Sequence, residues 1–187
     1  MFDSGDGTLP DKVNAFLEAG EKPIAFTAGT FNTSSDDFFE TSVKACRQIG
    51  KRAMLISPSQ EKISQSLPAG IAHFSYVPFG ALMPHLAAFV HHGGIGTLAQ
   101  AMAAGIPQLI RPMFGDQFDN AQRIMNLGIA KEVLPVDYTP YNAAKALMEL
   151  VDNPIYKQNS LRFAAMLKKE NGVSNACDAI LQKFGAL

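Results

Sequence analysis

The 187-residue sequence predicts an α/β fold, a doubly wound Rossmann-like parallel sheet of about six strands. Short apolar runs recur along the chain, and segments with apolar residues at helical spacing lie between most of them. Such alternation is typical of a parallel sheet covered by helices on both faces. A glycine-rich stretch joins one apolar run directly to a helix. We therefore expect one sheet-based domain that binds a ligand at the ends of its strands.

Each expected element has a signal in the sequence. The expected strands are the apolar runs 23–28, 52–57, 71–76, 87–90, 108–110 and 129–133. The expected helices are 10–19, 36–48, a segment ending before Gly105, one beginning near Asp119, 139–151, one starting at Asn153-Pro154, and 174–184. Several of these helices start at a proline or stop at a glycine, as helices commonly do.

Composition restricts the class of protein. We expect residues 1–22 to be a linker with a short N-terminal helix, and residues 23–187 to form the domain with its C-terminal helices. A net charge of −1 argues against a nucleic-acid partner. The sequence contains no run of 18 apolar residues, so no membrane span is expected. The N-terminus lacks a signal-peptide pattern, so a cytoplasmic location is expected. Cys46 and Cys177 are expected to be reduced and buried.

The central stretch is AFVHHGGIGTLAQAMAAGIPQLIRPMFGDQFDN, residues 88–120. Its glycines lie in the turn from a strand into a helix, where free backbone N–H groups and the helix dipole favour an anion, most often phosphate. Close packing of strand and helix is the alternative explanation. The pattern Gly93-x-x-Gly96-Thr97 is neither the dinucleotide fingerprint nor the Walker motif.

A second loop is expected beside this one. In the common strand order 3-2-1-4-5-6, strands 1 and 4 flank the point where the order reverses, and ligands bind there. The first strand ends in Thr27-Ala28-Gly29-Thr30 and the fourth in His91-His92-Gly93-Gly94. Both small-residue loops should therefore face one crevice.

The stretch also resembles a known family signature. The order His-x-Gly-x-x-Thr, helix, Gly-Ile-Pro, strand, Pro, Asp-Gln and Asn, spanning about residues 76–120, resembles the donor-binding signature of inverting GT-B nucleotide-sugar glycosyltransferases. The bacterial branch that acts on sterols, lipids and macrolides is the most similar. The resemblance implies one half of a GT-B fold, the C-terminal half that binds a UDP-sugar or a dTDP-sugar. It implies no metal and no further cofactor, and an acceptor, small molecule or lipid, held through an N-terminal domain.

The resemblance assigns the phosphate-binding residues. His92 aligns with the histidine that contacts a donor phosphate, although a packing histidine bonded to backbone is the structural alternative. The implied donors to the pyrophosphate are Gly94, Ile95, Gly96 and Thr97, opposite Gly29 and Thr30 on the first loop. Relatives often carry Asn where this chain has Gly96, so backbone N–H groups must contribute more here.

The remaining implied contacts involve the ribose, base and sugar. Gln100 stands where many relatives use a glutamate for the ribose hydroxyls; an exposed helix glutamine is the alternative. Tyr76 and the backbone of Val77 would receive the base, whereas a core tyrosine is the alternative for Tyr76. Asp116 and Gln117 would hold the sugar hydroxyls, against the alternative of a capping pair for the next helix.

Three functions follow from these assignments. The first is the donor-binding half of a hexosyltransferase that is inactive without its other half. The alternatives are a non-catalytic nucleotide-sugar-binding module and a nucleotide-sugar epimerase of the same fold. An epimerase needs acid and base carboxylates beside the sugar, and Asp116 is the one obvious candidate.

Two structural expectations remain. Asp119 and Asn120 are interpreted as helix caps, and the final helix is expected to expose apolar residues.

Overall fold

The computed structural model describes residues 7–29, 36–58, 63 and 66–185. Within them a single parallel sheet has the strand order β3-β2-β1-β4-β5-β6, which confirms the expected doubly wound topology. The strands are β1 Ile24–Thr27, β2 Ala53–Ile56, β3 Ile71–Phe74, β4 Ala88–His91, β5 Gln108–Ile110 and β6 Ala130–Glu132. Most are one or two residues shorter than the apolar runs that predicted them.

The helices also follow the predicted order, with one short helix at residues 79–82 that was not predicted. They are α1 Asp11–Glu18, α2 Asp36–Gln48, α3 Phe79–Leu82, α4 Ile95–Ala104, α5 Gln117–Asn126, α6 Pro140–Asp152, α7 Pro154–Leu167 and α8 Gly172–Phe184, with 3-10 turns η2 Met83–His85 and η3 Pro135–Asp137. The side chains of Thr139 and Asn153 accept hydrogen bonds from the first turns of α6 and α7, as their positions before prolines predicted.

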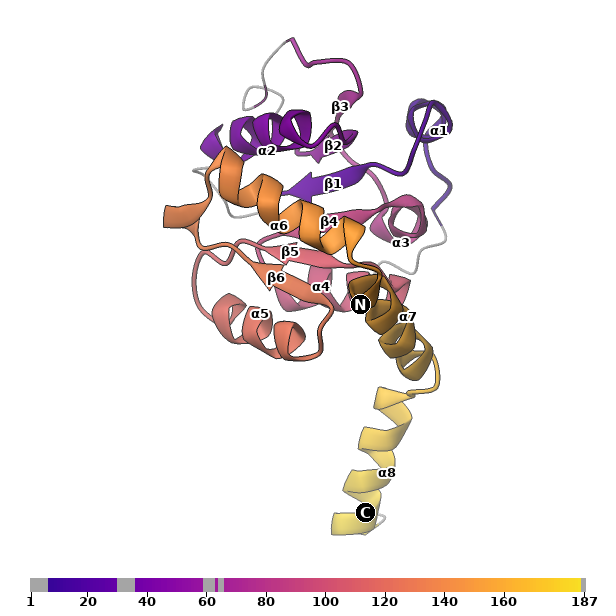
Figure 1. Cartoon of the computed structure of the whole chain (residues 1–187). Helices are drawn as coiled ribbons and strands as arrows, with labels where there is room; N and C mark the ends of the chain where they lie inside the picture. The colour runs from indigo at the N-terminus through magenta and orange to yellow at the C-terminus, as the bar shows by residue number, and fades with distance from the viewer. Residues whose placement is uncertain (1–6, 30–35, 59–62, 64–65, 186–187) are drawn as a thin grey trace.

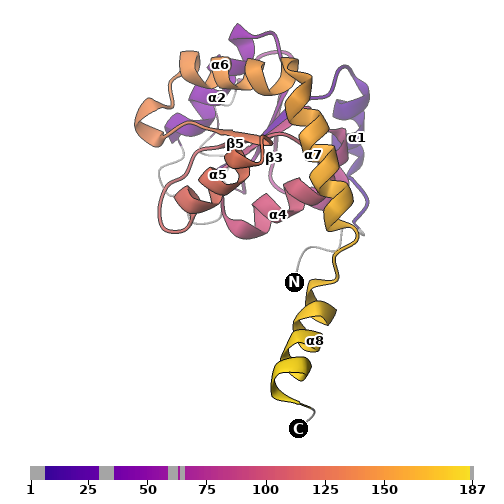
Figure 2. The same cartoon turned by 60° about the horizontal axis from the view of Figure 1, so that its bottom comes forward.

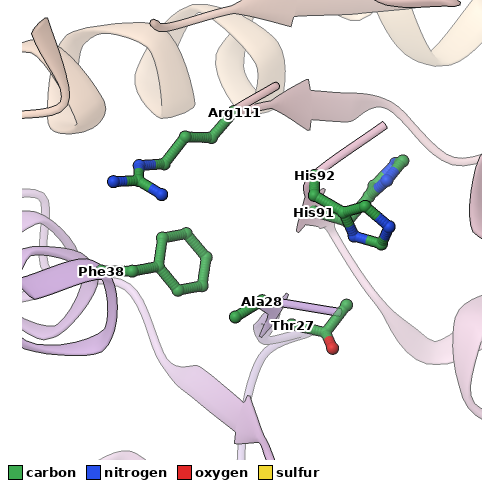
Figure 3. Close-up of a pocket in the computed structure, with 6 residues that line it drawn as sticks. All are labelled: Thr27, Ala28, Phe38, His91, His92 and Arg111. Atoms are coloured by element: carbon green, nitrogen blue, oxygen red, sulfur yellow. The ribbon is translucent and has the colours of Figure 1, made fainter. Parts of the chain in front are cut away.

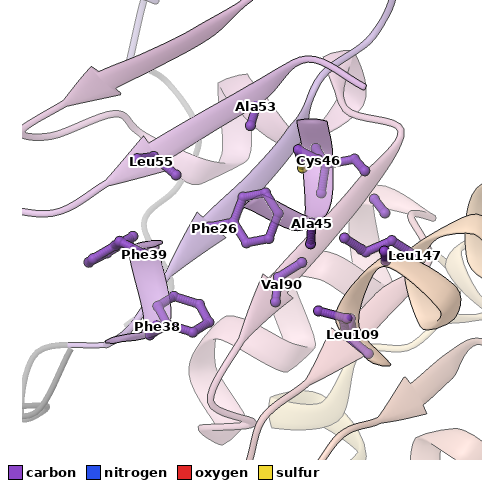
Figure 4. Close-up of a cluster of buried hydrophobic side chains, with 14 of the residues drawn as sticks. Phe26, Phe38, Phe39, Ala45, Cys46, Ala53, Leu55, Val90, Leu109 and Leu147 are labelled. Carbon is purple, nitrogen blue, oxygen red and sulfur yellow. The ribbon is translucent and has the colours of Figure 1, made fainter. Parts of the chain in front are cut away.

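Helices α2 and α6 cover one face of the sheet (Figure 1). Phe26, Leu55, Val90 and Leu109 of the strands pack there against side chains of these two helices, among them Phe38 and Leu147 (Figure 4). Helices α1, α3, α4 and α5 cover the other face. Because both faces are covered, the central strands are apolar at consecutive positions rather than at alternate ones.

Helix α1 is packed onto the domain. Val13 is 1% exposed and belongs to the same buried cluster as Ala25, Met54 and Phe89 of the sheet. The guanidinium of Arg52 lies 4.2 Å from the centroid of the Phe16 ring. The first described helix therefore contributes to the core beside β2.

Helix α8 extends away from the rest of the molecule, beyond the end of α7 (Figures 1 and 2). None of its side chains is buried. Cys177 lies on it and is exposed, so the expectation that both cysteines are buried is wrong for this residue. Cys46 belongs to α2 and is buried in the core, and this burial raises its pKa to about 12.

Candidate functional site

The loops after β1 and β4 lie side by side. Strands β1 and β4 pair in register from Ile24 opposite Ala88 to Phe26 opposite Val90. The two strands therefore end at the same level of the sheet. A pocket at this edge is lined by Ala28 of the first loop and by His92 of the second (Figure 3). Gly29 faces the His92 ring. Thr30, the other residue expected in the first loop, lies outside the described residues.

His92 is half-buried between two glycines. A Cβ added to Gly29 would come within 2.6 Å of the imidazole, and one added to Gly94 within 2.5 Å. Its Nδ1 is buried and has no hydrogen-bond partner among the described residues. Burial lowers the pKa of His92, and the charge of Asp116 opposes this shift. The described residues thus leave one ring nitrogen unused at the crevice.

His91 has the opposite character, because both of its nitrogens are used. The Gly93 N–H donates to Nδ1 at 3.1 Å, so Nδ1 carries no proton and Nε2 must be the protonated nitrogen. Nε2 then donates to Oε1 of Gln108 at 2.9 Å. The ring is buried, stacks on Phe89, and burial lowers its pKa to about 3. His91 is therefore a structural residue.

The N-terminus of α4 opens at the same edge. Gly93 has φ +88°, and a Cβ there would lie 2.9 Å from Ile110. The helix begins after Gly94, which offers no capping side chain. The backbone N–H groups of Ile95, Gly96 and Thr97 belong to the first turn, where N–H groups have no partner within the helix. Gly96 has open space around it, so a ligand can approach these groups.

The residues expected at the base and ribose lie on neighbouring elements. Tyr76 follows β3 and is 70% exposed, which excludes the alternative of a core tyrosine. Val77 is only 2% exposed as a whole residue, and its side chain belongs to a buried cluster of the core. Gln100 on α4 is half-buried, and its Oε1 is buried without a partner among the described residues. This burial argues against the alternative of an exposed helix glutamine.

Asp116 and Gln117 lie where β5 leads into α5, but the structure separates their roles. Gln117 is 4% exposed, and its Oε1 accepts hydrogen bonds from the backbone N–H groups of Met113 at 2.8 Å and Phe114 at 3.2 Å. Asp116 is exposed and occupies the N-cap position of α5 without a capping side-chain bond. The carboxylate is open to a ligand, whereas the glutamine oxygen is used by its own loop.

The interpretation of Asp119 and Asn120 as helix caps is wrong, because α5 begins at Gln117 and contains both. Asp119 pairs with Arg123 at 2.6 Å on the surface. The Nδ2 of Asn120 donates to the Gly93 carbonyl at 3.0 Å and to Oδ2 of Asp116 at 2.8 Å. The spacing of Asp119 and Arg123, four residues apart as in an ion pair within a helix, was the signal that this segment lies inside α5.

Arg111 is a further residue of the crevice that the sequence interpretation missed. It follows β5 and lines the pocket together with Thr27, Phe38 and the residues named above (Figure 3). Its guanidinium lies 5.6 Å from the Phe38 ring centroid and 5.3 Å from that of Tyr138. Burial lowers its pKa, and its Nε has no hydrogen-bond partner among the described residues. The crevice thus holds a positive charge besides the helix terminus.

Within the described residues, no three His, Cys, Asp or Glu side chains come together as a metal site. Among the same residues, no helix is both long and apolar enough to cross a membrane.

Comparison with known proteins decides the family. Residues 50–181 match the family described as erythromycin biosynthesis protein CIII-like, C-terminal domain. The chain belongs to this family. The matched range contains β2 to β6, the α4 turn and the Asp116 loop, whereas the loop after β1 lies outside it.

This EryCIII-like domain has curated relatives among glycosyltransferases. It is 32% identical over 165 residues to O-mycaminosyltylonolide 6-deoxyallosyltransferase of Streptomyces fradiae, covering 87% of this chain and 38% of the relative. It is 32% identical over 154 residues to sterol 3-beta-glucosyltransferase of Kluyveromyces lactis, covering 78% of this chain and 13% of the relative. The chain therefore spans well under half the length of these relatives.

Solved structures agree with this assignment. The glycotransferase of kitacinnamycin superposes with a TM-score of 0.79 at 25% identity, over 96% of this chain and 45% of that one. The glycosyltransferase VinC, solved in complex with dTDP, superposes with a TM-score of 0.76 at 27% identity, over 94% and 44%. The EryCIII-like domain thus has the fold of one half of a GT-B glycosyltransferase.

Proposed function

We propose that this EryCIII-like domain binds the nucleoside-diphosphate-sugar donor, and that the whole protein transfers a hexose from a UDP-sugar to an acceptor hydroxyl. The single observation that carries the proposal is the convergence at one crevice of the unused His92 nitrogen and the open first turn of α4. A dTDP-sugar is the alternative donor, and the complex of VinC with dTDP supports a nucleoside diphosphate as the ligand class.

Each group in the crevice has a role in this proposal. The N–H groups of Ile95, Gly96 and Thr97 and the His92 ring bind the diphosphate, with Gly29 allowing close approach. Tyr76 and Val77 receive the base and Gln100 the ribose. Asp116 accepts hydrogen bonds from the sugar hydroxyls. Gln117 does not contact the ligand in this proposal; its hydrogen bonds hold the loop that carries Asp116.

Transfer needs the leaving diphosphate to be stabilised as the glycosidic bond breaks. Preorganised N–H groups at the α4 terminus and the neighbouring His92 and Arg111 supply this stabilisation without a metal. The general base that activates the acceptor hydroxyl belongs, by the family resemblance, to an amino-terminal domain. The acceptor, a small molecule or lipid, would bind mainly there.

The alternatives have less support. The relatives reported above are glycosyltransferases, which favours transfer over both a binding module and an epimerase.

The free cysteines Cys46 and Cys177 suit a reducing compartment, and we propose a cytoplasmic location for this reason.

Titration calorimetry of the chain with UDP, UDP-glucose and dTDP tests the proposal. We expect saturable heat with at least one nucleotide, and competition between UDP and the UDP-sugar for a single site. The absence of both heat and a thermal shift with all three at millimolar concentration would overturn it.

A further inference from the structure

The peptide of Gly93 is held on both sides by side chains. Its N–H donates to Nδ1 of His91 at 3.1 Å, and its carbonyl oxygen accepts from Nδ2 of Asn120 at 3.0 Å. His91 belongs to β4 and Asn120 to α5, so two elements clamp one residue from opposite directions. Gly93 needs such restraint, because glycine at φ +88° is otherwise free to adopt many other conformations.

These two hydrogen bonds are part of a longer network. On the other side of the His91 imidazole, Nε2 donates to Oε1 of Gln108 at 2.9 Å. Beyond Asn120, the second hydrogen of the same Nδ2 reaches Oδ2 of Asp116 at 2.8 Å. Both partners of this nitrogen are acceptors, so the orientation of the Asn120 amide is determined: the opposite orientation would place its oxygen against two oxygens.

We propose that Asn120 is a positioning residue that couples the phosphate-binding turn to the sugar-binding carboxylate. This inference rests on the proposed function, since it takes the α4 turn and Asp116 as two parts of one donor site. Asn120 holds the Gly93 carbonyl and so fixes the direction in which the following N–H groups point. It also holds one Asp116 oxygen and so presents the other to the sugar.

The arrangement has a consequence for binding. A single side chain bonded to both parts makes their positions interdependent, so loss of Asn120 weakens the contacts with phosphate and with sugar together. Asp116, at the end of the chain of bonds, affects the sugar alone. Asn120 itself need not touch the ligand.

The test compares Asn120→Ala and Asn120→Asp with Gln122→Ala, a matched control. Gln122 lies two residues further along α5, is exposed, and bonds within the helix to Asn126. By calorimetry we expect Asn120→Ala to lower the affinity for UDP roughly two- to tenfold, the range for one lost hydrogen bond. The affinity for UDP-glucose should fall by more. Gln122→Ala should bind both as the unaltered chain does.

Asn120→Asp adds a readout that a merely structural role would not move. The new carboxylate would face the Gly93 carbonyl and Asp116 with no hydrogen to donate, and its protonation would restore one donor. Affinity relative to Asn120→Ala should therefore rise as the pH falls. In the ligand-free protein, the Gly93 NMR signal of Asn120→Asp should show this titration step in addition to that of the neighbouring His92, whereas Asn120→Ala and Gln122→Ala should lack the additional step.

Two failures are distinguishable. If the unaltered chain binds no nucleotide, the proposed function fails, while the ligand-free NMR titration still reports whether Asn120 controls the turn. If the unaltered chain binds UDP-glucose and Asn120→Ala binds both ligands within twofold of it, the coupling is refuted. Asp116→Asn retains an acceptor for Asn120, so it should leave the Gly93 signal in place; a shift as large as that of Asn120→Ala also refutes the proposal.

Discussion

The imidazole of His92 occupies the space that a side chain on Gly29 would need. A Cβ on Gly29 would lie 2.6 Å from the ring, and Gly29 has φ +81°, a conformation that other residues rarely adopt. Gly94 approaches the same ring from the other side, at 2.5 Å. The two glycines therefore determine where the His92 ring can lie.

Replacement of either glycine by alanine should displace His92. We expect UDP to bind roughly tenfold more weakly to Gly29→Ala and Gly94→Ala, the effect of losing about one hydrogen bond. Gly29→Ala should also destabilise the fold by about 1–3 kcal/mol because of backbone strain. Calorimetry and urea denaturation measure the two effects. Gly172→Ala at the start of α8, with open space around it, is the control; wild-type affinity in the Gly29 variant would contradict the prediction.

Stability should fall as the pH is lowered, because of His91. Its pKa is about 3 in the folded protein against an ordinary value of 6.5, so the unfolded chain binds a proton that the folded protein does not. The stability that the neutral His91 contributes to the fold is fully present above pH 6.5. As the pH falls from 6.5 towards 3, the free energy of unfolding decreases by about 1.4 kcal/mol per pH unit. Urea denaturation at pH 7 and pH 5 measures it.

The matched variant for this experiment is His91→Asn. Its side-chain oxygen can still accept the Gly93 N–H, but the residue does not titrate in this range. Between pH 7 and pH 5 the unaltered chain should lose about 2 kcal/mol more than the variant. Equal losses would show that His91 is not held neutral in the fold.

Asp116→Ala and Gln117→Ala should have different effects. Asp116→Ala should weaken UDP-glucose by roughly two- to tenfold or more while leaving UDP almost unchanged, because its carboxylate faces the sugar in the proposed complex. Gln117→Ala should cost about 1–3 kcal/mol of stability, since the N–H groups of Met113 and Phe114 lose their acceptor. Thermal unfolding and calorimetry on both variants separate the roles; a purely sugar-selective effect of Gln117→Ala would contradict this division.

Helix α8 should promote self-association. Ile180, Leu181 and Phe184 are 58%, 54% and 72% exposed, and nothing in the described structure covers them. We expect sedimentation to show concentration-dependent association of the chain. Replacing the three residues by serine should abolish it, whereas Gln182→Ala on the same helix should not. A monomeric unaltered chain at high concentration would be the contrary result.

The chain alone should bind donor without catalysing transfer. Product formation from UDP-glucose with a panel of hydroxyl acceptors should be absent for this chain and present for a longer chain that carries an amino-terminal domain. The reason is that inverting transfer needs a general base at the acceptor hydroxyl, which the proposal places in that domain. Comparable turnover by the two would overthrow this assignment.

Local patterns were enough to predict the sheet and the outline of the site. Apolar runs of strand length separated by helical segments led to the six-stranded parallel topology, because a buried parallel strand requires consecutive apolar residues. The prolines after Thr139 and Asn153 marked helix starts correctly. His92 and the glycine turn could be singled out because their spacing within one segment is itself the signal.

Only the tertiary structure decided which of these residues face the crevice and which support it. Gln117 and Asn120 are both polar residues of α5, yet one is bonded to its own loop and the other to Gly93, 27 residues away. Arg111 lines the crevice because β5 ends beside β4, and its aromatic neighbours come from α2 and from Tyr138. A local pattern encodes backbone conformation and burial, but partners distant in sequence are set by how strands and helices pack, which no single segment specifies.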